Sequence, residues 1–101
     1  MISLSGKTDV YEKASDLFKA IAHPIRLKIV HRLCMDDGSN VTSLYKELDL
    51  PQSTVSQHLG RLKHAGVISG VRSGNEVIYT MANEEVKNIF RILSISQNPN
   101  I

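Results

Sequence analysis

The segment from Leu50 to Ile68 holds the side chains best suited to binding chemistry. Val55, Leu59 and Leu62 recur at i, i+4 and i+7, which predicts one buried stripe on a helix from Pro51 to Ala65. Amide, hydroxyl and guanidinium groups remain on the outward face, and such groups hydrogen-bond to base edges and phosphates. The pattern predicts a helix that lies in a DNA groove through the outward residues Gln52, Ser53, Ser56, Gln57 and Arg61.

Three helices are expected before this segment. Apolar residues at helical spacing predict helices over Thr8–Ala22, Pro24–Met35 and Thr42–Leu48, and Thr42 is a natural N-cap for the third. The residue before Pro24 is steered away from helical angles, which separates the first two helices. A short turn over 49–51 then joins the third helix to the polar one, so the pair is predicted to be a helix-turn-helix.

A hairpin and a final helix are expected after Gly66. The apolar period becomes alternating, which predicts strands over Val67–Arg72 and Glu76–Met81 with a tip at 73–75. Helical spacing returns over Ala82–Ser96, where the apolar face is wide enough to be buried on two sides. The predicted fold is therefore mainly α with a small β-hairpin, in one domain over 1–101 with an ordered core of about 8–96.

Charge distribution is more informative than net charge. The 101 residues carry a formal net charge of only +2, but the segment 51–73 contains three basic residues and no acid. One face is therefore predicted to be positive. Cys34 is the single cysteine, which excludes an intramolecular disulfide and suits a reducing cytoplasm. Residues 1–6 do not resemble a signal peptide and no apolar run approaches a bilayer span, so a cytoplasmic protein without a membrane partner is expected.

Four motifs together resemble the ArsR/SmtB family, which comprises small dimeric winged-helix transcription regulators of bacteria. They are AHPIRLKIV at 22–30, NVTSL at 40–44, PQSTVSQHLGRLKHAGVI at 51–68 and IYT at 78–80. The resemblance covers about residues 10–95 and is greatest to the metal-independent repressors of the family. It implies a winged helix-turn-helix that dimerises through its first and last helices, with Val10, Leu17, Val86, Ile89, Phe90 and Leu93 as the interface residues.

The resemblance also implies which residues meet DNA. The helix over 51–65 would enter the major groove, with Gln52, Ser53, Thr54, Ser56 and Gln57 facing bases or nearby phosphates. Thr42 and Ser43 would meet phosphate through their hydroxyls and backbone amides. Arg61 is expected to hold phosphate rather than a base because it lies well past the N-terminal half of its helix. Arg72 and Asn75 on the hairpin would reach the backbone or minor groove. For His58 two roles stay open, namely contact with DNA or packing against the third helix or the backbone.

The metal sites of the family lack their ligands in this chain. A thiolate site in the family uses a cysteine-any-cysteine pair where the third helix begins, and here Asn40 and Thr42 stand there. A second family site uses Asp and His near the start of the last helix and His or Glu near its end, where 83–85 reads Asn-Glu-Glu and 96–97 reads Ser-Gln. Because zinc needs about four ligands, no metal and no cofactor are expected.

The predicted function is sequence-specific regulation of transcription. A homodimeric repressor would occupy an inverted repeat in promoter double-stranded DNA. Two other functions stay open, a redox- or ligand-responsive sensor of the same fold and a winged helix that binds protein. An enzyme is not expected, because no His or carboxylate is placed to activate Cys34 and no Gly-rich phosphate loop occurs.

Overall fold

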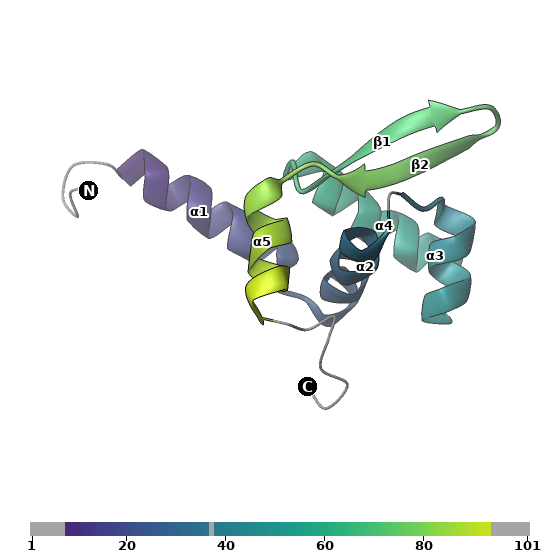
Figure 1. Cartoon of the computed structure of the whole chain (residues 1–101), viewed down its shortest axis with the longest axis horizontal. Coiled ribbons are helices and arrows are strands. Elements are labelled where there is room, and N and C mark those ends of the chain that lie inside the picture. Colours follow the sequence, from purple (N-terminus) through teal and green to yellow (C-terminus); the bar gives the residue numbers. More distant parts are fainter. Residues whose placement is uncertain (1–7, 37, 94–101) are drawn as a thin grey trace.

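In the described part of the chain, five helices and one hairpin follow each other in the predicted order (Figure 1). The computed structural model describes residues 8–36 and 38–93. The elements are α1 (Thr8–Ile21), α2 (Pro24–Met35), α3 (Val41–Leu48), α4 (Gln52–His64), β1 (Ile68–Ser73), β2 (Glu76–Met81) and α5 (Glu84–Leu93). The predicted end of the last helix at Ser96, which is also the predicted end of the core, lies outside the described residues.

Side-chain caps set the helix starts, and two of them correct the prediction. Asn40 rather than Thr42 caps α3, since the Asn40 Oδ1 accepts the Ser43 N–H at 2.8 Å. Thr42 is already inside the helix there, where its hydroxyl cannot act as the cap. The helix α5 begins at Glu84, two residues later than predicted, because the Asn83 Oδ1 accepts the Val86 N–H at 2.9 Å.

The hairpin is a two-stranded antiparallel sheet that projects from the helical body (Figure 1). Its register runs from Ile68↔Met81 at the base to Ser73↔Glu76 at the tip, where Gly74 takes a φ of +64°. Ser39 forms an isolated bridge to Tyr79, with N–H···O distances of 3.0 and 2.8 Å. The base of the hairpin is thereby held against the segment that leads into α3.

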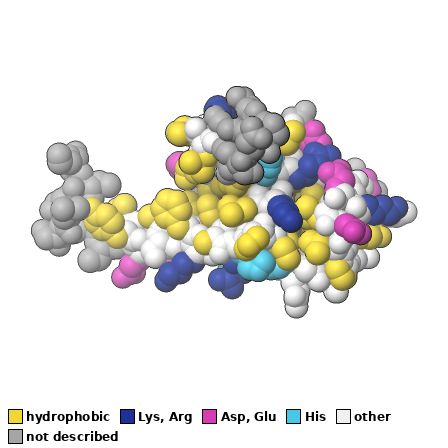
Figure 2. All heavy atoms as spheres, turned by 90° about the horizontal axis from the view of Figure 1, so that it is seen from below, with side chains coloured by type: hydrophobic (Ala, Val, Ile, Leu, Met, Phe, Trp, Pro, Cys, Tyr) yellow, Lys and Arg dark blue, Asp and Glu magenta, His cyan; other side chains and the backbone are white. Residues whose placement is uncertain are grey.

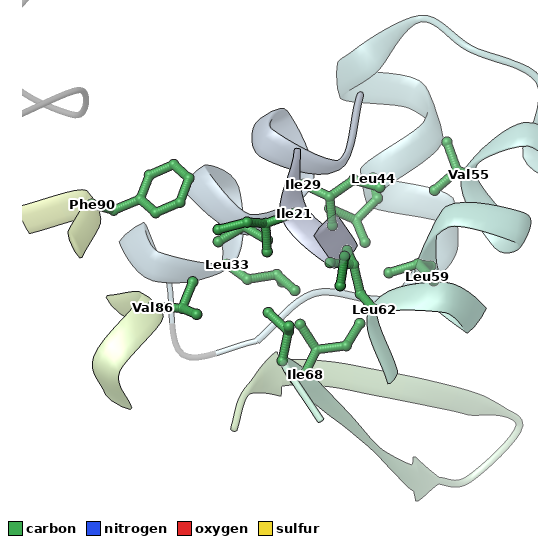
Figure 3. Close-up of a cluster of buried hydrophobic side chains, with 13 residues drawn as sticks. Ile21, Ile29, Leu33, Leu44, Val55, Leu59, Leu62, Ile68, Val86 and Phe90 are labelled. Atoms are coloured by element: carbon green, nitrogen blue, oxygen red, sulfur yellow. The ribbon is translucent and has the colours of Figure 1, made fainter. Parts of the chain in front are cut away.

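The buried core lies behind α4. The predicted stripe of Val55, Leu59 and Leu62 is at most 1 % exposed, which confirms it. Figure 3 shows side chains from α2, α3 and β1 around this stripe, among them Leu33 and Ile68, while Val86 and Phe90 of α5 pack on the other side of Leu33. Because the apolar side of α4 is held from several directions, its opposite side faces outward in a fixed orientation. Among the residues that the structure describes, no helix is both long and apolar enough to cross a bilayer.

Candidate nucleic-acid interface

The outward face of α4 is polar, exposed and free of acidic residues. Thr54 and His58 are the half-buried members of the predicted set on this helix. No side chain caps the start of α4, where Pro51 precedes the helix, so its first N–H groups can meet an anion. The exposed members are Gln52, Ser53, Ser56, Gln57 and Arg61.

A left-handed residue sets the turn between α3 and α4. Asp49 has a φ of 55°, and the Leu50 N–H then bonds to the Tyr45 carbonyl at 3.1 Å, which ends α3. At the other end of α3, the Thr42 side chain is exposed and can reach a ligand. The Ser43 amide cannot, because Asn40 already accepts its hydrogen. The prediction of a phosphate contact through that amide is therefore wrong, while contact through the hydroxyls stays a prediction.

His58 packs against α2, which is a different partner from the predicted ones. Its Nδ1 lies 3.2 Å from Arg26 Nη1, and its ring centroid is 4.5 Å from that of His23. Arg26 is only 8 % exposed, and its Nε donates to the Ala20 carbonyl at 2.5 Å. Burial lowers the pKa of His58, and the nearby side chains of His23, Arg26 and Arg61 lower it further, because positive charge beside the ring disfavours its protonated form. The imidazole is therefore neutral at neutral pH.

The hairpin is attached to α3 by side chains as well as by backbone. Asn40 Nδ2 donates to Glu76 Oε2 at 2.7 Å, while the Oδ1 of the same amide caps α3. The predicted DNA residues Arg72 and Asn75 are exposed near the hairpin tip. The sequence prediction missed Asn40 as a positioning residue, although asparagine directly before a helical pattern is a known N-cap signal.

The model of the bacterial regulatory protein, arsR family, matches residues 23–69 of the chain. The transcriptional repressor PagR of Bacillus anthracis is 42 % identical over 83 residues, which span 82 % of this chain and 83 % of PagR. The chain belongs to the ArsR family. The repressor SmtB of Mycobacterium tuberculosis is 41 % identical over 81 residues, which span 80 % of this chain and 59 % of SmtB. The predicted resemblance is thus confirmed.

Solved structures of relatives confirm the fold. The crystal structure of PagR superposes with a TM-score of 0.79 at 41 % identity, covering 85 % of this chain and 98 % of PagR. Reduced HlyU from Vibrio cholerae superposes with a TM-score of 0.84 at 32 % identity, covering 93 % of this chain and 98 % of HlyU. This ArsR-family protein is therefore a winged helix-turn-helix regulator that binds DNA, and α3 and α4 are its helix-turn-helix.

The predicted dimer residues of this ArsR-family protein divide into two groups. Val86 and Phe90 are at most 4 % exposed and belong to the core of the protomer itself, so they are not available to a second copy. This corrects their assignment, because the inner face of α5 covers α2. The other predicted residues are exposed or half-buried along the outer surfaces of α1 and α5: Val10, Leu17, Ile89 and Leu93.

These outer surfaces carry exposed apolar side chains on both helices. A groove of about 980 Å³ lies between α1, the end of α4 and the start of α5. Figure 2 shows apolar side chains along α1, and Phe18 and Ile92 are 54 % and 79 % exposed on the two helices. The prediction that α5 is buried on two sides is met on its inner side, while its outer side is uncovered in a single protomer.

The described residues contain no group of three or more His, Cys, Asp or Glu side chains that could hold a metal ion. Cys34 is half-buried, and burial raises the pKa of its thiol, with Lys87 and Arg91 acting in the opposite direction. A thiol with a raised pKa holds less of the reactive thiolate. The geometry of this part of the chain therefore gives no specific support to a metal or thiolate sensor.

Proposed function

We propose that this regulator is a repressor that binds an inverted repeat in promoter DNA as a homodimer. The observation that carries the proposal is the acid-free, exposed polar face of α4 in front of a buried apolar stripe. The similarity to PagR, which is named a transcriptional repressor, supports this sign of regulation. HlyU of Vibrio cholerae is named a transcriptional activator at 39 % identity, so the sign needs a direct test. The site of action would be the cytoplasm, where the DNA lies.

Base contacts would supply the sequence preference, and phosphate contacts would hold the protein on the DNA. Gln57 is the first candidate for base reading, because its amide can pair with adenine at two points in the major groove. Arg61 and the hydroxyl of Thr42 would hold phosphates on either side. Arg72 and Asn75, exposed on the hairpin, would contact the flanking backbone or minor groove.

Dimerisation would use the apolar surfaces of α1 and α5. Val10, Phe18, Ile92 and Leu93 are between 41 % and 79 % exposed, which is costly for large apolar side chains in a lone protomer. A second copy packed there would place the two α4 helices symmetrically. Two-fold symmetry of the protein then matches two-fold symmetry of the operator.

Binding to the upstream DNA of the gene that encodes this chain, compared with random DNA at several salt concentrations, tests the proposal. We expect a preference for the upstream DNA and a log K that falls steeply with log salt. Gln57→Ala should reduce the preference by about tenfold, whereas Arg72→Ala should weaken binding to both DNAs alike. Equal binding to both sequences would contradict specific regulation, and weak salt dependence would favour a protein-binding winged helix.

The dimer and the sign of regulation need separate measurements. Sedimentation at micromolar concentration should give a dimer, and Ile92→Glu should give a monomer with an unchanged helical spectrum. A promoter fused to a reporter should be less active when the protein is present. A wild-type monomer would overturn the α1 and α5 interface, and higher reporter activity would make the protein an activator.

A further inference from the structure

The imidazoles of His23 and His58 lie side by side where α2 meets α4. The hydrogen bonds at their Nδ1 atoms determine which ring nitrogen carries the proton. The His23 Nδ1 accepts the Ile25 N–H at 3.1 Å, and the His58 Nδ1 lies 3.2 Å from Arg26 Nη1. A backbone amide and a guanidinium can only donate, so neither Nδ1 carries a proton. Each neutral ring therefore holds its proton on Nε2 and has one N–H left to donate.

Both of these N–H groups reach the surface. His23 and His58 are half-buried residues, and within the described residues their Nε2 atoms have no hydrogen-bond partner. The only buried side-chain nitrogen or oxygen without a partner in that part of the chain is Nε2 of His31. The Nε2 atoms of His23 and His58 are therefore open to solvent, on rings whose centroids are 4.5 Å apart.

The surroundings of the two donors favour an anion. Arg61 lies one turn beyond His58 on α4 and is exposed. It is close enough to lower the pKa of both His58 and Arg26. His23 is also the N-cap of α2, a helix of 12 residues whose amino end adds a positive potential. The two Nε2–H groups and the guanidinium supply donors and no acceptor, which matches the oxygens of a phosphate better than the mixed edge of a base.

We propose that His23, His58 and Arg61 together bind one phosphate group of the DNA backbone. This inference rests on the DNA binding described under Proposed function, and it adds α2 to the helices that contact DNA. It also assigns both roles to His58, since one nitrogen packs against Arg26 and the other faces the ligand. Free inorganic phosphate offers the same oxygens, so the test must be made on phosphates within DNA.

Asparagine substitutions separate the two nitrogens. The Oδ1 of asparagine stands near the position of a histidine Nδ1 and accepts the same hydrogen, but no atom replaces Nε2. His23→Asn keeps the cap of α2, since asparagine is a good N-cap, and His58→Asn keeps an acceptor for Arg26. His58→Gln is the matched control, because its longer side chain returns an N–H near the position of Nε2.

The two asparagine substitutions should lower the affinity for DNA without changing its dependence on salt. His23→Asn and His58→Asn should each weaken binding to operator and random DNA about tenfold, the usual effect of a hydrogen bond to a charged group. The slope of log K against log salt should stay the same, because a neutral donor releases no counterion. Arg61→Ala should make that slope shallower by about 0.9. His58→Gln should recover most of the lost affinity.

Methylphosphonate substitution identifies the phosphate itself. Replacing each operator phosphate in turn should reveal one position in each half-site where wild-type affinity falls more than that of the His23→Asn/His58→Asn protein, in which only Arg61 still contacts that phosphate. Nitrogen chemical shifts should show Nε2–H tautomers for both rings at pH 7.5. Thermal midpoints of the variants should remain close to that of the wild type, which would exclude misfolding as the cause.

Two results would overturn the proposal. One is an unchanged DNA affinity in the His23→Asn/His58→Asn protein, which is also the outcome if the site takes only free phosphate. The other is equal sensitivity of wild type and double variant to methylphosphonate at every position. If wild-type protein itself bound no DNA, the failure would instead lie with the DNA-binding function.

Discussion

Replacing Arg26 with methionine should lower the free energy of unfolding by more than the loss of a surface ion pair does. Arg26 joins three elements, since it starts in α2, donates to the Ala20 carbonyl at the end of α1 and meets His58 on α4. It does so while 8 % exposed, and among the described residues no carboxylate forms a salt bridge with it. Burial accordingly lowers the pKa of Arg26, and Arg61 lowers it further.

The magnitude follows from the bonds that are lost. Two hydrogen bonds from a charged donor contribute about 1.5–3 kcal/mol each, while the contact to the Lys19 carbonyl at 3.5 Å is too long to add much. Methionine would leave the Ala20 carbonyl without its donor in a buried place, but it would also relieve the cost of burying a charge. Offsetting these terms, we expect the free energy of unfolding to fall by about 2–3 kcal/mol.

Arg32→Met is the matched control. Arg32 bonds to both Glu47 and Asp36, and its Nη2 lies 2.9 Å from Glu47 Oε1, but its side chain is 29 % exposed at the surface. Water screens such pairs, so this variant should lose less than about 1 kcal/mol. Urea denaturation at pH 7.5 and a single fixed protein concentration compares the two, because a dimer's stability depends on concentration. A loss in Arg26→Met no greater than in Arg32→Met would refute the reasoning.

Three further outcomes are expected. Asn40→Asp should keep the cap of α3 but place a second carboxylate beside that of Glu76. Hydroxyl-radical footprints of the DNA should then lose protection only where the hairpin meets it. Adding Glu76→Gln should restore this protection, because the glutamine amide can donate to the new aspartate. Leu62→Ala removes a fully buried side chain and should lower the free energy of unfolding by about 2–5 kcal/mol in urea. The contribution of His58 to the free energy of unfolding should be complete above pH 6.5 and be lost as the pH drops through the lowered pKa of His58, because the unfolded chain binds the imidazole proton at a higher pH than the folded chain. The same pH titration of His58→Asn should show a smaller loss of stability.

Periodicity predicted the elements well because it depends only on burial of one side. Val55, Leu59 and Leu62 repeat at helical spacing, and the core that covers them is built from the same kind of repeat in the other helices. Helix starts were less predictable. Asn40 and Thr42 are both good caps two residues apart, and periodicity does not distinguish them when the apolar residue between them, Val41, fits either start.

Contacts between distant segments could not be predicted from the sequence. Arg26 and His58 are 32 residues apart, and neither has a partner of opposite charge that would have suggested the pair. The two sides of α5 present the same difficulty. Its apolar face is too wide for one neighbour, so spacing alone could not say that Val86 and Phe90 turn inward while Ile92 and Leu93 turn outward.

The two sides of a single ring explain how α4 can be both held and free to read DNA. If His58 served only the core, replacing it would lower stability and affinity together; if it served only DNA, affinity alone would change. The geometry separates the two roles by atom, because Nδ1 faces Arg26 and Nε2 faces solvent. An asparagine that keeps the inner bond should therefore change affinity at constant stability, whereas Arg26→Met should change stability and disturb affinity through the released ring. A loss of affinity at constant stability in His58→Asn is the result that a purely structural histidine could not produce.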